Sequence, residues 1–337
     1  MTVRVGINGF GRIGRCVLRV LAARPELEVV AINDLYAPEQ LAYLLRYDSI
    51  MGEHLEAIEV RAGALVVGGR EIRLFRSREP RAVPWRDAGV DYVVESTGIF
   101  LTRAQLAGHL EAGARRVVLT VPPKDALDAM IVMGVNDDRL RPEHRLVSNA
   151  SCTTNCLAPI VKILDDAFGF RRGFMTTVHA YTNDQRLADV PHKDLRRSRA
   201  AAVNLIPTTT GAARAVGKIL PHLAGRLDGM AVRVPVPDGS LVDLVCELAT
   251  PAKADEINSA VESAAAGAMA SIVEFSRAPL VSNDVIGNSH SSIFDSLSTI
   301  ADGDGWARVV SWYDNEWGYS SRVADVLTKL ASFDRVS

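Results

Sequence analysis

The chain contains 337 residues, enough for two domains because a single hydrophobic core stops growing at about 250–300 residues. Its 48% hydrophobic, 23% charged and 6% aromatic residues are typical of a folded globular protein and exclude a disordered chain. The net charge of -2 comes from 38 basic and 40 acidic residues without long like-charged runs, so we expect no nucleic-acid and no membrane partner.

Targeting signals and disulfides are not expected either. No stretch approaches the roughly 18 uninterrupted apolar residues of a membrane span, and the N-terminal MTVRVGING alternates like a strand instead of resembling a signal peptide. Four cysteines are too few for a disulfide framework, and no CxxC pair indicates zinc. We therefore expect a cytoplasmic protein with free thiols and no metal.

Up to about residue 150, short β-branched runs alternate with runs of helical periodicity. The expected strands are residues 2–8, 28–34, 91–97, 115–120, 130–135 and 145–149, and the expected helices are 12–24, 38–47 and 102–113. Buried strands that alternate with helices predict a parallel sheet covered on both faces. Thr102 and Gln105 have the spacing of a capping box, and Gly68 and Gly69 predict a hairpin in ALVVGGREIRLF.

Beyond Cys152 the strands become longer and the helices are less regularly interleaved, which predicts a second, mixed α+β domain. The expected strands are 174–181, 230–237 and 240–248, and residues 317–333 have the apolar spacing of a final helix. The polar segment 182–204 lacks a clear period and is longer than ordinary connections, so we interpret it as an ordered, functional loop.

A dinucleotide fingerprint, GxGxxG, is present as Gly9, Gly11 and Gly14. It follows a predicted strand, opens a predicted helix, and precedes Asp34 by the roughly 20 residues that place a carboxylate at the adenosine ribose. Glycines let the backbone approach a pyrophosphate, and the helix N-terminus attracts its negative charge. Because an acidic residue repels a 2′-phosphate, Asp34 favours NAD over NADP. The alternative interpretation is a tight turn followed by a loop aspartate.

Cys152 is a candidate nucleophile. It follows Ser151, a suitable N-cap, and so lies in the first turn of a predicted helix, where the dipole and free N–H groups lower the pKa of a thiol. His179 ends a strand 27 residues downstream, and a crossover of ordinary length would bring it back as the partner base. The alternative is that both are ordinary buried residues. Cys156, one turn further, is interpreted as structural.

Several motifs together resemble the phosphorylating glyceraldehyde-3-phosphate dehydrogenase family: INGFGRIGR, YDSI, ESTG, SNASCTTNCLAP, HAYTNDQR, PHKDLRRSRAAA, PTTTGAA, RVPVP and SWYDNEWGYS. They occur in the family's order over essentially the whole chain. The resemblance implies an α/β fold with an N-terminal Rossmann dinucleotide-binding domain at 1–150, rejoined by the C-terminal helix 317–337, and an α+β catalytic domain at 151–316. It also implies a homotetramer, in which 182–204 is the S-shaped loop near the cofactor and the subunit interfaces.

The resemblance also implies roles for individual residues, with Cys152 and His179 as the catalytic pair. The residues implied to bind NAD are Gly9, Gly11, Arg12, Ile13, Asp34, Arg78, Thr120 and Asn315. Among them, Arg12 and Ile13 would cover the pyrophosphate, and Asn315 would hold the nicotinamide carboxamide.

Two phosphate sites are implied as well. Thr182 and Arg233 would bind the phosphate of the substrate. The residues implied for the inorganic phosphate are Ser151, Thr153, Thr210 and Gly211, with Arg197 close to both sites. Hydroxyls, a glycine N–H and guanidinium groups make charge-assisted contacts to phosphate oxygens. Thr210 and Gly211 are equally suited to capping the helix that follows.

The implied activity is the oxidation of glyceraldehyde 3-phosphate to 1,3-bisphosphoglycerate, with NAD and inorganic phosphate as the other substrates. One alternative is erythrose-4-phosphate dehydrogenase, a close relative that uses the same cysteine and histidine on a longer aldehyde. Another is a member that uses NADP or both cofactors, because Val190 stands before Pro191 where many NAD-specific members carry leucine. A third is an RNA-associating protein using Arg196, Arg197 and Arg199, although a solvated or interface-lining face explains that cluster more simply.

Overall fold

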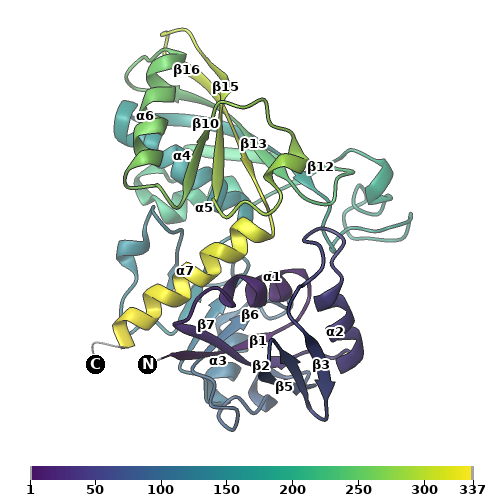
Figure 1. Ribbon diagram of the computed structural model, residues 1–337. Coiled ribbons are helices and arrows are strands. Elements are labelled where there is room, and N and C mark those ends of the chain that lie inside the picture. The colour runs from purple at the N-terminus through teal and green to yellow at the C-terminus, as the bar shows by residue number, and fades with distance from the viewer. Residues whose placement is uncertain (1, 335–337) are drawn as a thin grey trace. The chain divides into compact units, whose positions relative to one another are not determined.

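The computed structural model describes residues 2–334, and the chain forms two compact units (Figure 1). The first unit contains the residues up to 131, residues 138–150 and the C-terminal part from 320. The second contains residues 132–137 and 151–319. Nowhere in the described part of the chain is there a helix of the length and apolarity that crossing a bilayer requires.

The first unit is built on a sheet that has nine strands within residues 2–334, in the order β3-β4-β5-β2-β1-β6-β7-β9-β8. Its strands are β1 (Val3–Asn8), β2 (Leu27–Asn33), β3 (Ile58–Arg61), β4 (Ala64–Val67), β5 (Arg70–Phe75), β6 (Tyr92–Glu95), β7 (Arg116–Leu119), β8 (Ala129–Met130) and β9 (Leu146–Ser148). The pairs β3–β4 and β4–β5 are antiparallel and the other pairs are parallel. The predicted parallel sheet and the Gly68–Gly69 hairpin are therefore confirmed.

The helices of the first unit are α1 (Arg12–Leu21), α2 (Pro38–Arg46) and α3 (Arg103–Glu111), and α7 (Trp317–Asp334) supplies residues from 320 onward. The predicted capping box is present, since the Thr102 hydroxyl accepts from the Gln105 N–H at 3.4 Å. The strand expected at 130–135 is wrong beyond Met130. There the Asn136 amide oxygen accepts from the Val132 N–H at 2.8 Å, and this local turn takes the place of a ladder bond.

A fully buried polar chain crosses the interior of the first unit. The Trp85 indole N–H donates to His109 Nδ1 at 2.9 Å, and His109 Nε2 lies 3.0 Å from the Glu95 carboxylate. Because Nδ1 accepts, the ring proton is on Nε2 and is donated to Glu95. Glu95 also accepts from the Asn8 amide at 2.6 Å and from the Thr97 N–H at 2.9 Å. The chain thus links α3 to the ends of β1 and β6.

The second unit contains a mixed sheet with seven strands in the described residues, in the order β11-β12-β10-β13-β16-β15-β14. Its strands are β10 (Phe170–Ala180), β11 (Ile206–Thr209), β12 (Leu227–Val234), β13 (Ser240–Leu248), β14 (Val273–Ser276), β15 (Ser292–Ala301) and β16 (Trp306–Tyr313). The pairs β10–β12 and β14–β15 are parallel and the others antiparallel, which confirms the expected α+β character.

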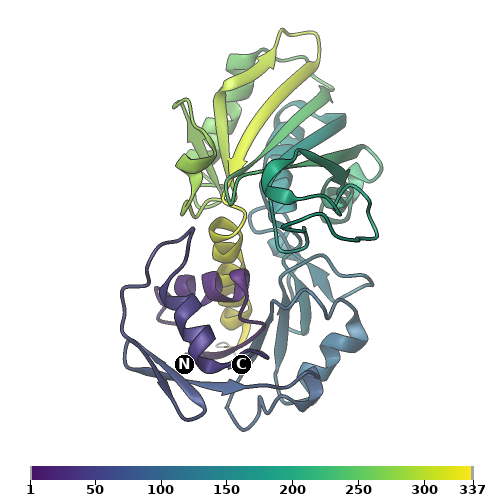
Figure 2. The same ribbon diagram turned by 90° about the vertical axis from the view of Figure 1, so that its right-hand side faces the viewer.

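Three helices belong to this unit, namely α4 (Cys152–Phe168), α5 (Ala212–Ile219) and α6 (Ala254–Ala266). Helix α4 packs against β10, β13, β15 and β16 and so covers a face of this sheet (Figures 1 and 2). Short 3-10 helices occur in both units at Pro80–Ala82, Asp137–Arg139, Ala201–Val203, Pro221–Leu223 and Ser282–Val285.

Segment 182–204 folds back on itself. Arg186 and Ala200 form an isolated bridge, and the Val190 N–H donates to the Ser198 carbonyl at 3.0 Å. An ion pair of 2.7 Å joins Arg199 to Asp189. These contacts explain why a segment without helical or strand periodicity is nevertheless ordered, because its polar groups bind one another.

Removing the imidazole in His109→Leu should lower the free energy of unfolding by about 2–4 kcal/mol, because it leaves the buried Trp85 N–H without an acceptor and takes one of the donors from the buried Glu95 carboxylate. The control is His222→Leu, since His222 is exposed and its bond to Asp165 should contribute at most about 1 kcal/mol. Urea unfolding followed by fluorescence measures both. Equal losses in the two variants would contradict a stabilising role for the buried chain.

Candidate active site

A pocket of about 460 Å³ opens on the first unit beyond the carboxyl ends of β1, β2 and β6. Residues lining it include Asn8, Gly9, Gly11, Asn33, Asp34, Ser77, Arg78, Ser96, Thr97 and Phe100. In open α/β sheets, ligands bind outside the carboxyl ends of the strands. The pocket brings together four residues predicted to bind the cofactor, which are Gly9, Gly11, Asp34 and Arg78.

The three fingerprint glycines meet different steric demands. Gly9 has φ +90°, and a Cβ there would lie 2.7 Å from the Thr97 nitrogen. A Cβ on Gly14 would lie 2.2 Å from the Gly9 carbonyl oxygen, so this glycine lets α1 pack on the preceding turn. Gly11 is the N-cap of α1, makes no side-chain cap, and faces open space in the described structure. The helix N-terminus is therefore accessible to an anion.

Asp34, which follows β2, hydrogen-bonds to the glycine-rich turn between β1 and α1. One carboxylate oxygen accepts from the Phe10 N–H at 2.7 Å, and the other accepts from the Tyr36 N–H at 3.1 Å. An ionised carboxylate offers about four acceptor positions, so two backbone bonds leave capacity for ribose hydroxyls. The same group can therefore shape the loop and bind a ligand.

Four predicted cofactor residues are not in the lining of this pocket: Arg12, Ile13 and Thr120 of the first unit, and Asn315 of the second. The Arg12 guanidinium forms an ion pair with Asp48 at 2.6 Å. Burial tends to raise the pKa of the Asp48 carboxyl. Hydrogen bonds from Arg12 and from two backbone N–H groups outweigh burial and hold this pKa below its ordinary value. Ile13 follows in the first turn of α1. Thr120 is buried, and its hydroxyl donates to the Glu95 carbonyl at 3.0 Å.

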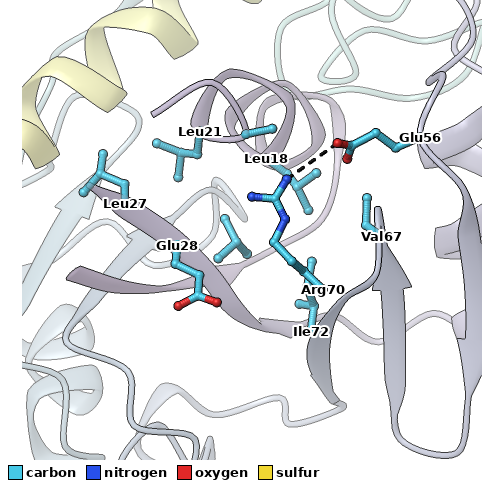
Figure 3. A pocket seen from close by; sticks show the side chains of 10 residues that line it. Leu18, Leu21, Leu27, Glu28, Glu56, Val67, Arg70 and Ile72 are labelled. Carbon is cyan, nitrogen blue, oxygen red and sulfur yellow. Dashed lines mark ion pairs between the residues drawn. The ribbon is translucent and has the colours of Figure 1, made fainter. Parts of the chain in front are cut away.

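A second, much smaller pocket in the same unit lies between α1 and the strands β2, β4 and β5 (Figure 3). Leu18, Leu21, Val67 and Ile72 form its apolar wall, and the side chains of Arg70 and Glu56 pair across it at 3.6 Å. With a volume of about 30 Å³, it has room for water but not for a dinucleotide.

Cys152 is the first residue of α4, as predicted, and Ser151 is its N-cap. The Ser151 hydroxyl accepts from the Thr154 N–H at 3.1 Å. The turn before the helix is sharp, because Ala150 has φ +54°, a left-handed conformation rare for residues with a side chain. Cys152 is partly exposed, whereas Cys156 is fully buried beside Ser292, in agreement with a structural role.

The structure brings Cys152 and His179 together, with 3.5 Å between Sγ and Nε2. His179 lies near the end of β10, where the parallel register places it opposite Arg233 of β12. Arg233 Nη1 lies 2.8 Å from His179 Nδ1 and donates to the Ala180 carbonyl at 3.0 Å. Nδ1 itself is 2.7 Å from the same carbonyl. A guanidinium thus lies on the far side of the ring from the sulfur.

These contacts are compatible with two tautomers of His179. With the proton on Nδ1, the ring donates to the Ala180 carbonyl and Nε2 is free to accept from the thiol. With the proton on Nε2, the Arg233 guanidinium donates to Nδ1 and the ring donates toward Sγ. Both arrangements place a neutral imidazole beside the sulfur, as a group that receives and returns protons requires.

The expected lowering of the thiol pKa is contradicted. Burial raises the pKa of Cys152 to about 11, although the Arg233 charge and the Thr153 N–H act in the opposite direction. Burial also lowers the pKa of His179 to about 3, and the nearby Arg233 charge lowers it further. The reason is that a helix N-terminus supplies only partial charge, while the surrounding side chains remove water from both groups. Both shifts favour the neutral forms, a thiol beside a neutral imidazole.

The predicted phosphate-binding residues are largely engaged with protein groups. Thr153 is buried, and its hydroxyl lies 2.9 Å from the Tyr313 hydroxyl, which also contacts Thr177 at 2.9 Å. Thr210 accepts from the Ala212 N–H at 3.2 Å, so it caps α5, whose N-cap Gly211 is exposed. This capping arrangement is the alternative considered for Thr210 and Gly211.

Thr182 and Arg197 meet at one carboxylate. The Thr182 hydroxyl donates to one oxygen of Asp184, and Arg197 Nη1 donates to the other. Arg197 Nε also donates to the Thr208 hydroxyl at 2.9 Å. An anion that binds Arg197 therefore competes with Asp184.

Asn315 is buried just past the end of β16, where its amide oxygen accepts from the Ser240 hydroxyl at 2.6 Å. Its N–H donates to Asp238 at 3.3 Å. Burial raises the pKa of Asp238 to about 9, and the neighbouring Asp314 and Glu316 carboxylates raise it further. Sequence reasoning missed Ser240, Asp238 and Tyr313, although the quoted motif SWYDNEWGYS contains the tyrosine. In residues 2–334 no group of three or more His, Cys, Asp or Glu side chains is arranged to hold a metal ion.

Because the Cys152 thiol stays protonated up to a pH well above 7, the fraction of reactive thiolate should rise about tenfold for each pH unit between about pH 7 and pH 9. The rate at which iodoacetamide alkylates Cys152 should rise by the same factor. Mass spectrometry of the modified peptide measures the rate, and Cys152→Ser gives the background. In the Arg233→Gln variant the alkylation of Cys152 should be slower than in the wild-type protein, because the guanidinium charge that favours the thiolate is gone. A rate that stays level over this range would show that the thiolate is already formed at neutral pH.

Comparison with known proteins identifies the family of the chain. Residues 3–103 match the family model described as glyceraldehyde 3-phosphate dehydrogenase, NAD binding domain, and residues 151–315 match the C-terminal domain of the same family. Glyceraldehyde-3-phosphate dehydrogenase of Geobacillus stearothermophilus is 54% identical over 333 residues, covering 98% of this chain and 99% of that protein. The Mycobacterium avium enzyme is 53% identical over 97% of this chain and 98% of its own length. Bacillus subtilis glyceraldehyde-3-phosphate dehydrogenase 2 is 51% identical over 98% of both chains. The chain belongs to the glyceraldehyde 3-phosphate dehydrogenase family.

Proposed function

We propose that this protein oxidises glyceraldehyde 3-phosphate and joins the resulting acyl group to inorganic phosphate, forming 1,3-bisphosphoglycerate and reducing NAD. The observation that carries the proposal is the 3.5 Å contact between Cys152 Sγ and His179 Nε2 at the start of α4, in a chain that belongs to this family. The relatives compared above carry the glyceraldehyde enzyme's name, which favours this substrate over erythrose 4-phosphate.

The first unit fits NAD. Its pocket combines an uncapped helix N-terminus at Gly11 with the Asp34 carboxylate, which suits a pyrophosphate and a free 2′-hydroxyl respectively. The residues we propose to hold NAD are Gly9, Gly11, Arg12, Ile13, Asp34, Arg78 and Thr120, with Asn315 at the carboxamide. When bound, NAD supplies the hydride acceptor at C4 of its nicotinamide ring.

Cys152 and His179 carry the covalent chemistry. The sulfur bonds to the aldehyde carbon, and the thiol proton passes through His179 Nε2 to the carbonyl oxygen, giving a thiohemiacetal. His179 removes that hydroxyl proton as the carbon gives up its hydride, which leaves a thioester on Cys152. An oxygen of phosphate then attacks the thioester carbon, the sulfur leaves, and His179 returns its proton to the thiolate.

Two groups of residues would bind the anionic parts of the substrates. Arg233 and Thr182 would hold the phosphate of the aldehyde, since Arg233 already lies beside His179. Ser151, Thr153, Thr210 and Gly211 would receive inorganic phosphate near the starts of α4 and α5, and Arg197 would serve both sites. Guanidinium groups and helix N-termini both favour such oxygens.

The larger organisation is also a proposal. Residues 1–150 with 317–337 would form the cofactor domain, and residues 151–316 the catalytic domain, in a homotetramer in the cytoplasm. Segment 182–204 supports assembly, because Leu187 is 87% exposed and Leu195 is 81% exposed there. Large apolar side chains on a folded segment favour burial against another chain.

The assay follows NADH absorbance with glyceraldehyde 3-phosphate, NAD and phosphate. NADH should accumulate with all three present, and Cys152→Ser should reduce kcat by at least about a thousandfold because the serine hydroxyl is far less nucleophilic than the thiol. The matched control, Cys156→Ser in the same helix, should retain activity. Faster turnover of erythrose 4-phosphate, or full activity in Cys152→Ser, would refute the proposal.

Asp34→Ala should raise the ratio of NADP to NAD efficiency by about tenfold or more, because it removes a ribose acceptor and a repulsive charge. The values of kcat/KM for both cofactors give the ratio, and thermal unfolding reports any loss of the Phe10 and Tyr36 bonds. An unchanged ratio would remove Asp34 from the ribose.

A further inference from the structure

Ser240 is a buried residue for which the reaction described above has no use. It begins β13, is 1% exposed, and pairs in register with Tyr313 of β16. Its hydroxyl oxygen lies 3.1 Å from the Ala180 nitrogen and 2.6 Å from the Asn315 amide oxygen. One hydroxyl therefore connects the residue after His179 with the residue proposed to hold the nicotinamide carboxamide.

The direction of these hydrogen bonds follows from what each group can do. A backbone N–H only donates, so the Ser240 oxygen accepts from Ala180. The hydroxyl proton is then free for an acceptor, and the Asn315 amide oxygen takes it at 2.6 Å. An amide whose oxygen accepts on one side presents its NH₂ group on the other. Ser240 thereby selects one of the two orientations that the Asn315 amide could adopt.

The backbone of Ala180 also contacts the proton carrier, through the carbonyl of the next peptide group. The Ala180 carbonyl accepts from Arg233 at 3.0 Å and lies 2.7 Å from His179 Nδ1. Because a peptide unit is rigid and planar, fixing the Ala180 N–H helps to fix the residue beside it. The bond from the Asn315 N–H to Asp238 holds the backbone of Asn315 from a second side.

We propose that Ser240 is a positioning residue that orients the Asn315 amide, so that its NH₂ group meets the nicotinamide carboxamide oxygen and one face of the ring is presented for hydride transfer. The inference rests on the proposed function. Ser240 acts through Asn315 and does not itself touch the substrate. The rate of hydride transfer depends steeply on the position of the nicotinamide ring, since a misplacement of about 1 Å lowers such a rate on the order of a hundredfold.

The test compares Ser240→Ala, Asn315→Ala and the double variant with the wild-type protein in the NADH assay. Ser240→Ala should lower kcat by about 10–100-fold while the KM for the aldehyde changes less than about threefold. In the Asn315→Ala background the same substitution should cost less than about twofold, because the group through which it acts is gone. Ser240→Thr keeps the hydroxyl and should recover most of the activity.

Hydride stereochemistry gives a readout that a general loss of stability would not change. With aldehyde deuterated at C1, wild-type protein should place deuterium on one face of C4 of NADH, and Ser240→Ala should place a measurable fraction on the other. The matched control is Ser276→Ala, since Ser276 is also buried and accepts from a backbone N–H, that of Ala278, at 3.1 Å. The Ser276→Ala variant should have the same kcat and the same hydride stereochemistry as the wild-type protein.

Equal losses from Ser240→Ala with and without Asn315, or unchanged stereochemistry together with unchanged kcat, would overturn the inference while leaving the proposed function intact. Failure of the wild-type protein to form NADH would instead refute the proposed function. The two failures are therefore distinguishable in one set of measurements.

Discussion

The contact between Arg233 and the far side of the His179 ring is the interaction on which the catalytic unit depends. Parallel register between β10 and β12 places these residues opposite each other, and α4 brings Cys152 to the near side of the ring. Burial is the main reason that the His179 ring stays neutral, and the positive charge of Arg233 lowers the pKa of the ring further. Sheet register thus contributes to the protonation state of a side chain that must take up and release protons.

Much of the fold was predictable because its signals are local. The largely buried strand β1 and the buried strand β6 are rich in β-branched residues, and the fingerprint glycines mark the turn between β1 and α1. The failure after Met130 arose because residues 131–135 resemble a strand in sequence, while a side-chain amide satisfies the backbone N–H of Val132 instead. No periodicity reports such a bond.

The site was predictable only in part, for a related reason. Ser151 as an N-cap and Cys152 as the first helical residue follow from neighbours in sequence. The bonds from Thr153 to Tyr313 and from Ser240 to Asn315 join residues 160 and 75 positions apart, and they depend on strand pairing that one sequence does not reveal. The direction of the Cys152 pKa shift was misjudged because burial, which outweighs the helix start, is a property of the folded chain.

The raised pKa of the Asp238 carboxyl makes the free energy of unfolding depend on pH. Its pKa in the folded chain is about 9, far above the value of about 3.9 for an unperturbed aspartate. A raised carboxyl pKa stabilises the fold below the unfolded value, and that contribution is lost as pH rises toward the folded value. Between these limits folding is coupled to proton uptake by Asp238, and the raised pKa of the neighbouring Asp314, caused by burial, acts in the same direction. Acidification over this range therefore favours the native state at this locus, the reverse of the usual behaviour of paired carboxylates.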